Sequence, residues 1–145
     1  MAAATVHASC VVVGEAGILI RGPSGSGKSR LAREILAAAG ASTFARLVCD
    51  DRVHLENRSG RLLARAVPAI AGRIEMRGVG LLAVPYEPAA VVRLVVDASS
   101  EHGERLPQER DDAVDVCGVT LPRITGTCES LAAAALWQVN VIMTG

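Results

Sequence analysis

The segment 22–29 reads Gly-Pro-Ser-Gly-Ser-Gly-Lys-Ser and matches the pattern G-x-x-x-x-G-K-S, which binds nucleotide phosphates. Glycines let the backbone wrap around phosphate oxygens with its N–H groups pointing inward, and the dipole of a following helix favours negative charge there. In this pattern Lys28 reaches the β- and γ-phosphates and the Ser29 hydroxyl holds Mg²⁺. The candidate residues for binding ATP are Gly22, Pro23, Ser24, Gly25, Ser26, Gly27, Lys28 and Ser29.

Carboxylates are the second group that could take part in phosphoryl transfer. Asp50 and Asp51 follow a short apolar run at 46–49, and Glu75 comes later in the chain. One carboxylate could bind Mg²⁺ while another accepts the proton of an attacking hydroxyl. A solvated strand end is the alternative for the aspartate pair, but the loop upstream favours function. His7 stands alone near the start of a strand, and the residues by themselves leave its role open.

The phosphate-binding pattern lies between a predicted strand and a predicted helix. The apolar run 18–20 precedes the loop, and apolar residues recur at helical spacing over 28–40, where Gly40 predicts the end of the helix. A strand over 6–13 reaches residue 18 through a tight turn at 14–17. Because this order is the context that the motif requires, a chance match is disfavoured.

The remaining pattern predicts an α/β protein with the ligand site at the carboxyl ends of its strands. The runs 53–56 and 61–64 alternate around a turn and predict an antiparallel hairpin, while 91–96 predicts another strand. A terminal helix is expected over 130–143, and the charged stretch 99–115 predicts a loop.

Composition limits the classes of function. A chain of 145 residues fits one domain, so we expect residues 1–145 to form a single catalytic domain. Fifteen basic and fifteen acidic side chains balance, without the basic stripe that binds nucleic acid. The chain has no signal-peptide pattern and no apolar stretch long enough to span a bilayer, which predicts a cytoplasmic protein without a membrane partner. The four cysteines are scattered, so core positions are favoured over zinc binding or disulfides.

Taken in order, these motifs resemble the catalytic domain of bacterial HPr kinase/phosphorylase. The matching pieces are His7 ahead of a hairpin, the loop at 22–29, Leu-Val-Cys-Asp-Asp-Arg-Val at 47–53, and Ile-Glu-Met-Arg-Gly-Val-Gly at 74–80. The loop alone is generic, whereas the ordered combination is far more specific and covers roughly residues 6–84.

The resemblance implies a P-loop nucleotide-binding fold of the HPr kinase type, with a mixed sheet and flanking helices. It implies a protein-serine kinase that uses ATP and Mg²⁺ to phosphorylate the phosphocarrier protein HPr, which many members also dephosphorylate using inorganic phosphate. It further implies a homo-oligomer, with Asp51 as the proton acceptor and Ser29 and Glu75 as Mg²⁺ ligands. The residues that it carries over as catalytic are His7, Lys28, Asp50, Asp51 and Arg105.

Some positions depart from the family pattern. Arg30 stands where an acidic residue is usual, and Ala8 replaces the usual glycine after the histidine. The segment 123–129 lacks the proline- and arginine-rich motif that members use for dephosphorylation, which weighs against phosphorylase activity. Without a counterpart of the separate N-terminal domain, the sequence resembles the short type associated with regulatory phosphotransferase systems.

Two other functions remain open at this stage. One is a P-loop kinase for a small metabolite, which the weakly matched C-terminal third leaves possible. The other is a non-catalytic nucleotide-binding module that signals through a partner, and Arg30 is the feature that most favours it.

Overall fold

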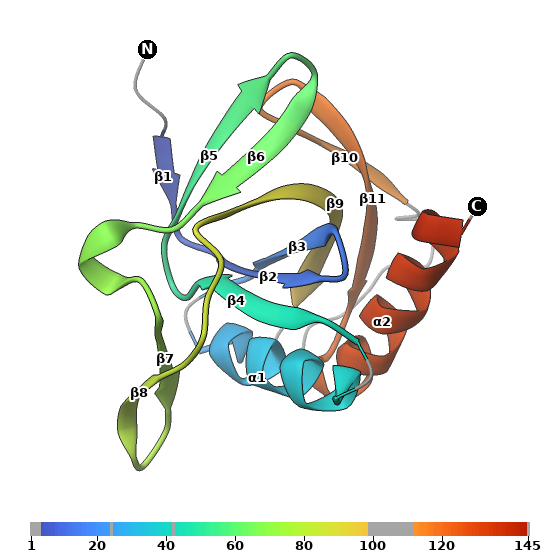
Figure 1. Cartoon of the computed structure of the whole chain (residues 1–145). Helices are drawn as coiled ribbons and strands as arrows, with labels where there is room; N and C mark the ends of the chain where they lie inside the picture. The colour runs from blue at the N-terminus through green and yellow to red at the C-terminus, as the bar shows by residue number, and fades with distance from the viewer. Residues whose placement is uncertain (1–3, 24, 42, 99–111, 145) are drawn as a thin grey trace.

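The computed structural model of the chain describes residues 4–23, 25–41, 43–98 and 112–144, shown in Figure 1. Across these residues a nine-stranded mixed sheet forms in the order β1-β5-β6-β9-β3-β2-β4, with β11 also paired to β9 and β10 paired to β11. The strands of this sheet are β1 (Ala4–Val6), β2 (Ser9–Val13), β3 (Ala16–Arg21), β4 (Ala45–Cys49), β5 (Val53–Arg58), β6 (Arg61–Arg65), β9 (Ala89–Ala98), β10 (Ala113–Val116) and β11 (Val119–Gly126).

Strand direction brings four carboxyl ends to one edge of the sheet. Strand β2 is antiparallel to both β3 and β4, so β3 and β4 run the same way. Strand β9 is parallel to β3, and β11 is parallel to β9. The glycine-rich loop after β3 and the aspartates after β4 therefore lie at the same edge, as the sequence predicts, although the sheet is mixed.

Two helices cover one face of the sheet, α1 (Lys28–Ala39) and α2 (Cys128–Thr144). Their buried side chains, such as Leu31 and Leu131, pack against Val11 and Ile18 of the central strands. Neither of these helices combines the length and the hydropathy needed to cross a membrane, within the part of the chain that the structure describes.

The sheet curls, so that its outer strands cover the opposite face of its central strands. The central strands turn Cys10 and Leu19 to this side, where they pack with Leu55 and Leu62 from the outer hairpin and with Leu121 of β11. Figure 1 shows this curl, with β5 and β6 bending over the central strands. Strands β2 and β3 are buried on both faces, which explains their nearly continuous apolar sequence.

The predicted helix after the loop is confirmed. It begins at Lys28 and ends at Ala39, with Gly40 at its C-cap at a positive φ of +68°. The terminal helix is also confirmed and runs from Cys128 to Thr144.

Two predictions along the chain are wrong. The expected strand over 6–13 is two strands that break at residues 7–8, because β1 pairs with β5 while β2 pairs with β3 and β4. The expected loop over 99–115 ends in strand β10, which pairs with β11 around a turn where Cys117 and Gly118 both have positive φ. Residues 99–111 lie outside the described residues.

A separate two-stranded hairpin carries Glu75. A short 3-10 turn (Pro68–Ile70) leads into β7 (Arg73–Met76), which pairs with β8 (Gly80–Ala83). In Figure 1 this hairpin projects from the body of the protein beside α1. Its Ile74 side chain is buried in the core that α1 shares with the sheet.

Candidate active site

The glycine-rich loop is packed so closely that two of its positions exclude any side chain. A Cβ atom on Gly22 would lie 2.6 Å from Ser26 Oγ and 2.7 Å from the Ala98 carbonyl oxygen. Gly27 has φ +93°, and a Cβ there would lie 2.9 Å from Cys128 Sγ. The backbone of the loop is therefore held tightly between β9 and the start of α2.

The start of α1 suits a phosphate group. Its first turn holds no acidic side chain, and no side chain caps its N-terminus. The Ser26 hydroxyl is buried without a hydrogen-bond partner among the described residues. Lys28 is buried, and its Nζ donates to the carbonyl oxygens of Gly22 at 3.0 Å and Pro23 at 3.3 Å, so the ammonium group lies across the loop. Free donors and a positive charge fit a nucleotide phosphate.

Asp50 is the centre of a buried hydrogen-bond network. The Ser29 hydroxyl lies 2.8 Å from both carboxylate oxygens, and the Ser9 hydroxyl donates to Oδ1 at 2.7 Å. The backbone N–H of Glu75 donates to Oδ2 at 3.2 Å. One carboxylate thus joins β2, α1 and β7, and it has hydrogen-bond donors on both of its oxygens.

Asp51 has a different environment from its neighbour. Its side chain is 66% exposed, and its Oδ1 lies 2.7 Å from His7 Nε2. Because an ionised carboxylate can only accept, Nε2 carries the hydrogen of this bond. The residue has φ +73°, a left-handed conformation, and its N–H donates to Ser9 Oγ at 3.1 Å. Asp51 is therefore the aspartate that a substrate from solvent can reach.

Ser9 is a site residue that sequence reasoning missed. It is 0% exposed, and its hydroxyl contacts both aspartates, donating to Asp50 and accepting from the Asp51 N–H. The available signal was a hydroxyl residue at the start of an apolar run two positions after His7, since a buried hydroxyl needs a partner.

Oxygen donors suitable for Mg²⁺ meet at Ser29 and Asp50. Mg²⁺ in nucleotide sites usually takes one or two carboxylates together with phosphate oxygens, so this pair fits a metal that arrives with ATP. Across the described residues, no group of three or more His, Cys, Asp or Glu side chains is arranged to hold a metal. Glu75 joins the network through its backbone N–H, and the role of its carboxylate as a metal ligand stays a prediction.

An ion-pair network lies at the same edge of the sheet. Asp97 accepts two hydrogen bonds from Arg21, at 2.7 Å and 2.9 Å, and a further one from Arg123 Nε. Burial raises the pKa of the Asp97 carboxyl, but the bonds from the two arginines outweigh it, so this pKa lies below its ordinary value. The network links strands β3, β9 and β11 through their side chains. Arg21, the last residue of β3, directly precedes the glycine-rich loop.

The structure brings most of the predicted site residues together. His7 pairs with Asp51 and Ser29 pairs with Asp50. Ser9 links the two pairs, and the backbone N–H of Glu75 joins at Asp50. Two predicted residues, Ser24 and Arg105, lie outside the described residues.

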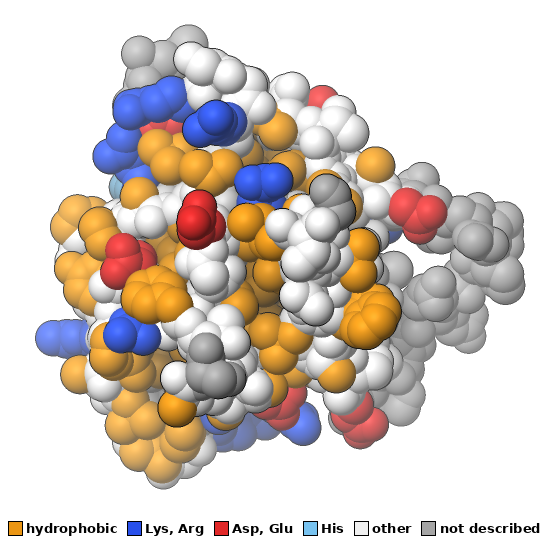
Figure 2. Space-filling model, turned by 45° about the vertical axis from the view of Figure 1, so that its right-hand side comes forward, with side chains coloured by type: hydrophobic (Ala, Val, Ile, Leu, Met, Phe, Trp, Pro, Cys, Tyr) orange, Lys and Arg blue, Asp and Glu red, His pale blue; other side chains and the backbone are white. Residues whose placement is uncertain are grey.

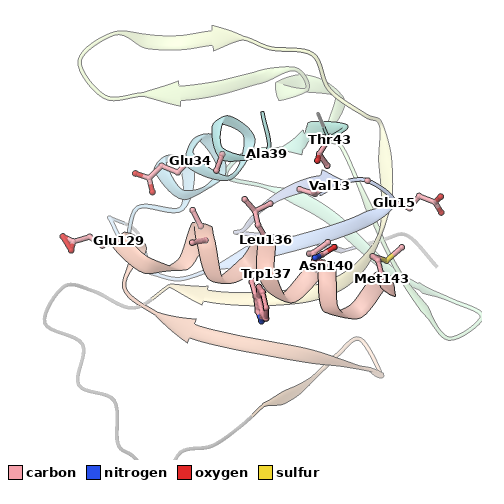
Figure 3. Close-up of a pocket in the computed structure, with 15 residues that line it drawn as sticks. Val13, Glu15, Glu34, Ala39, Thr43, Glu129, Leu136, Trp137, Asn140 and Met143 are labelled. Carbon is pink, nitrogen blue, oxygen red and sulfur yellow. The ribbon is translucent and has the colours of Figure 1, made fainter. Parts of the chain in front are cut away.

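A hollow of about 1150 Å³ lies elsewhere on the molecule, between α1, α2 and the turn that joins β2 to β3. Figure 3 shows Leu136, Trp137 and Asn140 of α2 lining it, opposite Ala39 at the end of α1 and Val13 at the end of β2. None of the predicted site residues lines it, so this hollow is not part of the candidate active site. On the face in Figure 2, acidic and basic side chains both lie scattered among hydrophobic ones.

Comparisons with known proteins agree on one family. Residues 1–128 match the family model described as HPr Serine kinase C-terminal domain. Curated proteins named HPr kinase/phosphorylase are similar, one from Clostridium beijerinckii at 38% identity over 130 residues and one from Clostridium tetani at 32% over 108 residues. The matches cover 83% and 73% of this chain, but the chain spans only 41% and 34% of the length of those relatives.

A solved structure supports the same fold. The Hpr(Ser) kinase/phosphatase from Coxiella burnetii superposes with a TM-score of 0.80, covering 98% of this chain and 99% of that chain. The sequences are 22% identical, so the comparison bears on the fold alone. The expected mixed α/β architecture is confirmed.

Proposed function

Because the chain belongs to the HPr serine kinase C-terminal domain family, we propose that it transfers the γ-phosphoryl group of ATP to a serine of an HPr-family phosphocarrier protein. The observation that carries this proposal is the pairing of exposed Asp51 with His7, next to buried Asp50 and the Ser29 hydroxyl. A phosphate cradle and an accessible base thus lie side by side.

The two aspartates take different parts in the proposed reaction. Asp50 is buried and receives several hydrogen bonds, so it fits a role in holding Ser29 and a metal rather than in accepting a proton. Asp51 accepts the proton of the acceptor serine while the serine oxygen bonds to the γ-phosphorus and the bond to the leaving ADP oxygen breaks. His7 orients Asp51 through their hydrogen bond.

Lys28 and the start of α1 bind and orient the phosphates in this proposal. Mg²⁺, held at Ser29 and Asp50 with Glu75 as a further candidate ligand, supplies charge neutralisation for the phosphates when it is bound. Positioning and electrostatic stabilisation therefore provide most of the rate enhancement.

The proposal covers the forward reaction. The segment 123–129 forms the end of strand β11 and the start of α2. It includes Arg123, whose Nε hydrogen-bonds to Asp97. With this segment in place of the motif expected for dephosphorylation, we propose that phosphorolysis is weak or absent. The proposal includes a cytoplasmic location, where ATP is available, and assembly into a homo-oligomer.

The test is a phosphotransfer assay with purified protein, γ-labelled ATP, Mg²⁺ and an HPr-family protein. Label should appear on the acceptor serine and be lost with a Ser→Ala acceptor or with Lys28→Ala enzyme. Asp51→Asn should keep ATP binding and lose most turnover, whereas Asp112→Asn, a change of another exposed aspartate, should keep both.

Other outcomes would redirect the proposal. ATP binding without transfer to any phosphocarrier would favour the metabolite kinase or the nucleotide-binding module. Full turnover by Asp51→Asn would remove Asp51 from its assigned role.

A further inference from the structure

The hairpin that carries Glu75 has one buried face and one exposed face. Strands β7 and β8 pair so that Ile74 lies opposite Leu82, and both pack on the core shared with α1. The next pair is Glu75 with Leu81, and because side chains alternate along a strand, both point to the opposite face. This exposed face therefore places an apolar side chain directly beside Glu75.

Leu81 and its neighbour Val79 are unusually accessible for large apolar residues. Leu81 is 64% exposed and Val79, in the turn of the hairpin, is 65% exposed. The core contacts of Ile74 and Leu82 anchor the hairpin without using these two side chains. Their exposure thus adds nothing to the packing of this domain, and exposed apolar groups that lie together mark sites of protein contact.

This apolar surface lies one strand away from the candidate active site, because β7 separates Leu81 of β8 from Asp50. The N–H of Glu75 donates to Asp50 Oδ2, so the residue opposite Leu81 belongs to the hydrogen-bond network of the reaction centre. Arg73 and Arg77 of the same hairpin are also exposed. Any large acceptor that reaches Asp51 would lie next to this combination of apolar and basic side chains.

We propose that the exposed face of the β7–β8 hairpin, with Leu81 and Val79 at its centre, is the docking surface for the protein that carries the acceptor serine. This inference rests on the proposed function and deepens it. The occupant is a folded protein with apolar side chains beside its serine and acidic groups that can face Arg73 and Arg77. Small metabolites bind in concave sites that enclose them. The β7–β8 hairpin projects from the body of the protein (Figure 1), so its exposed face is suited to a protein partner and not to a small metabolite.

The experiment compares Leu81→Ser, Val79→Ser and the double variant with wild type, using an HPr-family protein as acceptor. The catalytic efficiency for the acceptor should fall about tenfold for each single variant, through a higher KM for the acceptor. Affinity for ATP and the thermal midpoint should stay at wild-type values, because neither side chain contacts the loop or the core. Leu81→Met, which keeps the apolar surface, should retain the wild-type efficiency.

The matched control is Phe44→Ser, which removes another exposed apolar side chain, 46% exposed, at the far end of β4 from Asp50. An unchanged KM for the acceptor in the Leu81 and Val79 variants, or an equal loss in Phe44→Ser, would overturn the docking surface while leaving the kinase activity standing. If wild-type protein binds ATP but labels no phosphocarrier, the proposed function fails and the docking surface fails with it.

Discussion

Removal of the Ser9 hydroxyl should affect both folding and turnover. In Ser9→Ala the Asp50 carboxylate loses a buried hydrogen bond of 2.7 Å, although Ser29 and the Glu75 N–H still donate to it. A hydrogen bond to a charged group contributes about 1.5–3 kcal/mol. The Asp51 N–H also loses its acceptor in this part-buried hydrogen bond. We expect the free energy of unfolding to fall by about 2–3 kcal/mol.

The effect on catalysis follows from the backbone of Asp51. Its left-handed conformation (φ +73°) costs about 1–2 kcal/mol for a residue with a side chain, and the bond to Ser9 helps to hold it. Without Ser9 Oγ the carboxylate is less well positioned, so we expect turnover to fall about tenfold or more while affinity for ATP is unchanged.

Urea unfolding followed by circular dichroism and the phosphotransfer assay would measure both effects. A loss of 2–3 kcal/mol corresponds to a fall in the thermal midpoint of about 4–12 °C for a domain of this size. The control is Ser130→Ala, whose exposed hydroxyl makes only a 3.5 Å contact and should change stability by less than about 0.5 kcal/mol. If Ser9→Ala matches this control in stability and wild type in turnover, the assignment of Ser9 as the residue that positions both aspartates is refuted.

Three further predictions concern the surroundings of the site. Gly27→Ala should lower both stability and ATP affinity, by urea unfolding and nucleotide titration, because its Cβ would lie 2.9 Å from Cys128 Sγ; wild-type values would contradict the close packing. Since the folded pKa of Asp97 lies below 3.8, its carboxylate stabilises the fold above about pH 4 and this stability is lost as pH falls through the folded pKa. Unfolding free energies from pH 7 to 3 should therefore fall more steeply for wild type than for Asp97→Asn, and parallel curves would count against the ion-pair network. Burial and the nearby Cys49 charge raise the pKa of Cys10 to about 12, so a thiol reagent should label exposed Cys117 in the folded protein and Cys10 only after unfolding; rapid native labelling of Cys10 would disprove this.

The sequence predicted the local part of the site well. The loop, the helix after it and the Gly40 stop depend on interactions within a few residues, so composition and spacing reveal them. Family membership was also predictable, because the motifs around the loop, the aspartates and Glu75 occur in a specific order. The break in the strand near His7 and the strand β10 were not predicted, because both depend on which distant strand each segment pairs with.

The different environments of the two aspartates could be seen only in the tertiary structure. Asp50 and Asp51 are identical side chains side by side in the sequence, yet one is buried among donors and the other faces solvent. Strand direction and register decide this, since they bring Ser9 and Ser29 to Asp50 and His7 to Asp51 across separations of 21 to 44 residues.

The sequence by itself therefore determined the glycine-rich loop, its helix and the family, because these follow from backbone geometry and short-range order. Only the tertiary structure decided that Ser9 joins both aspartates, that Cys128 donates to the Ser26 carbonyl of the loop at 2.9 Å, and that Leu81 lies beside Glu75 on an exposed face. Each of these contacts joins residues from different elements, and their positions are set by the pairing and curl of the sheet.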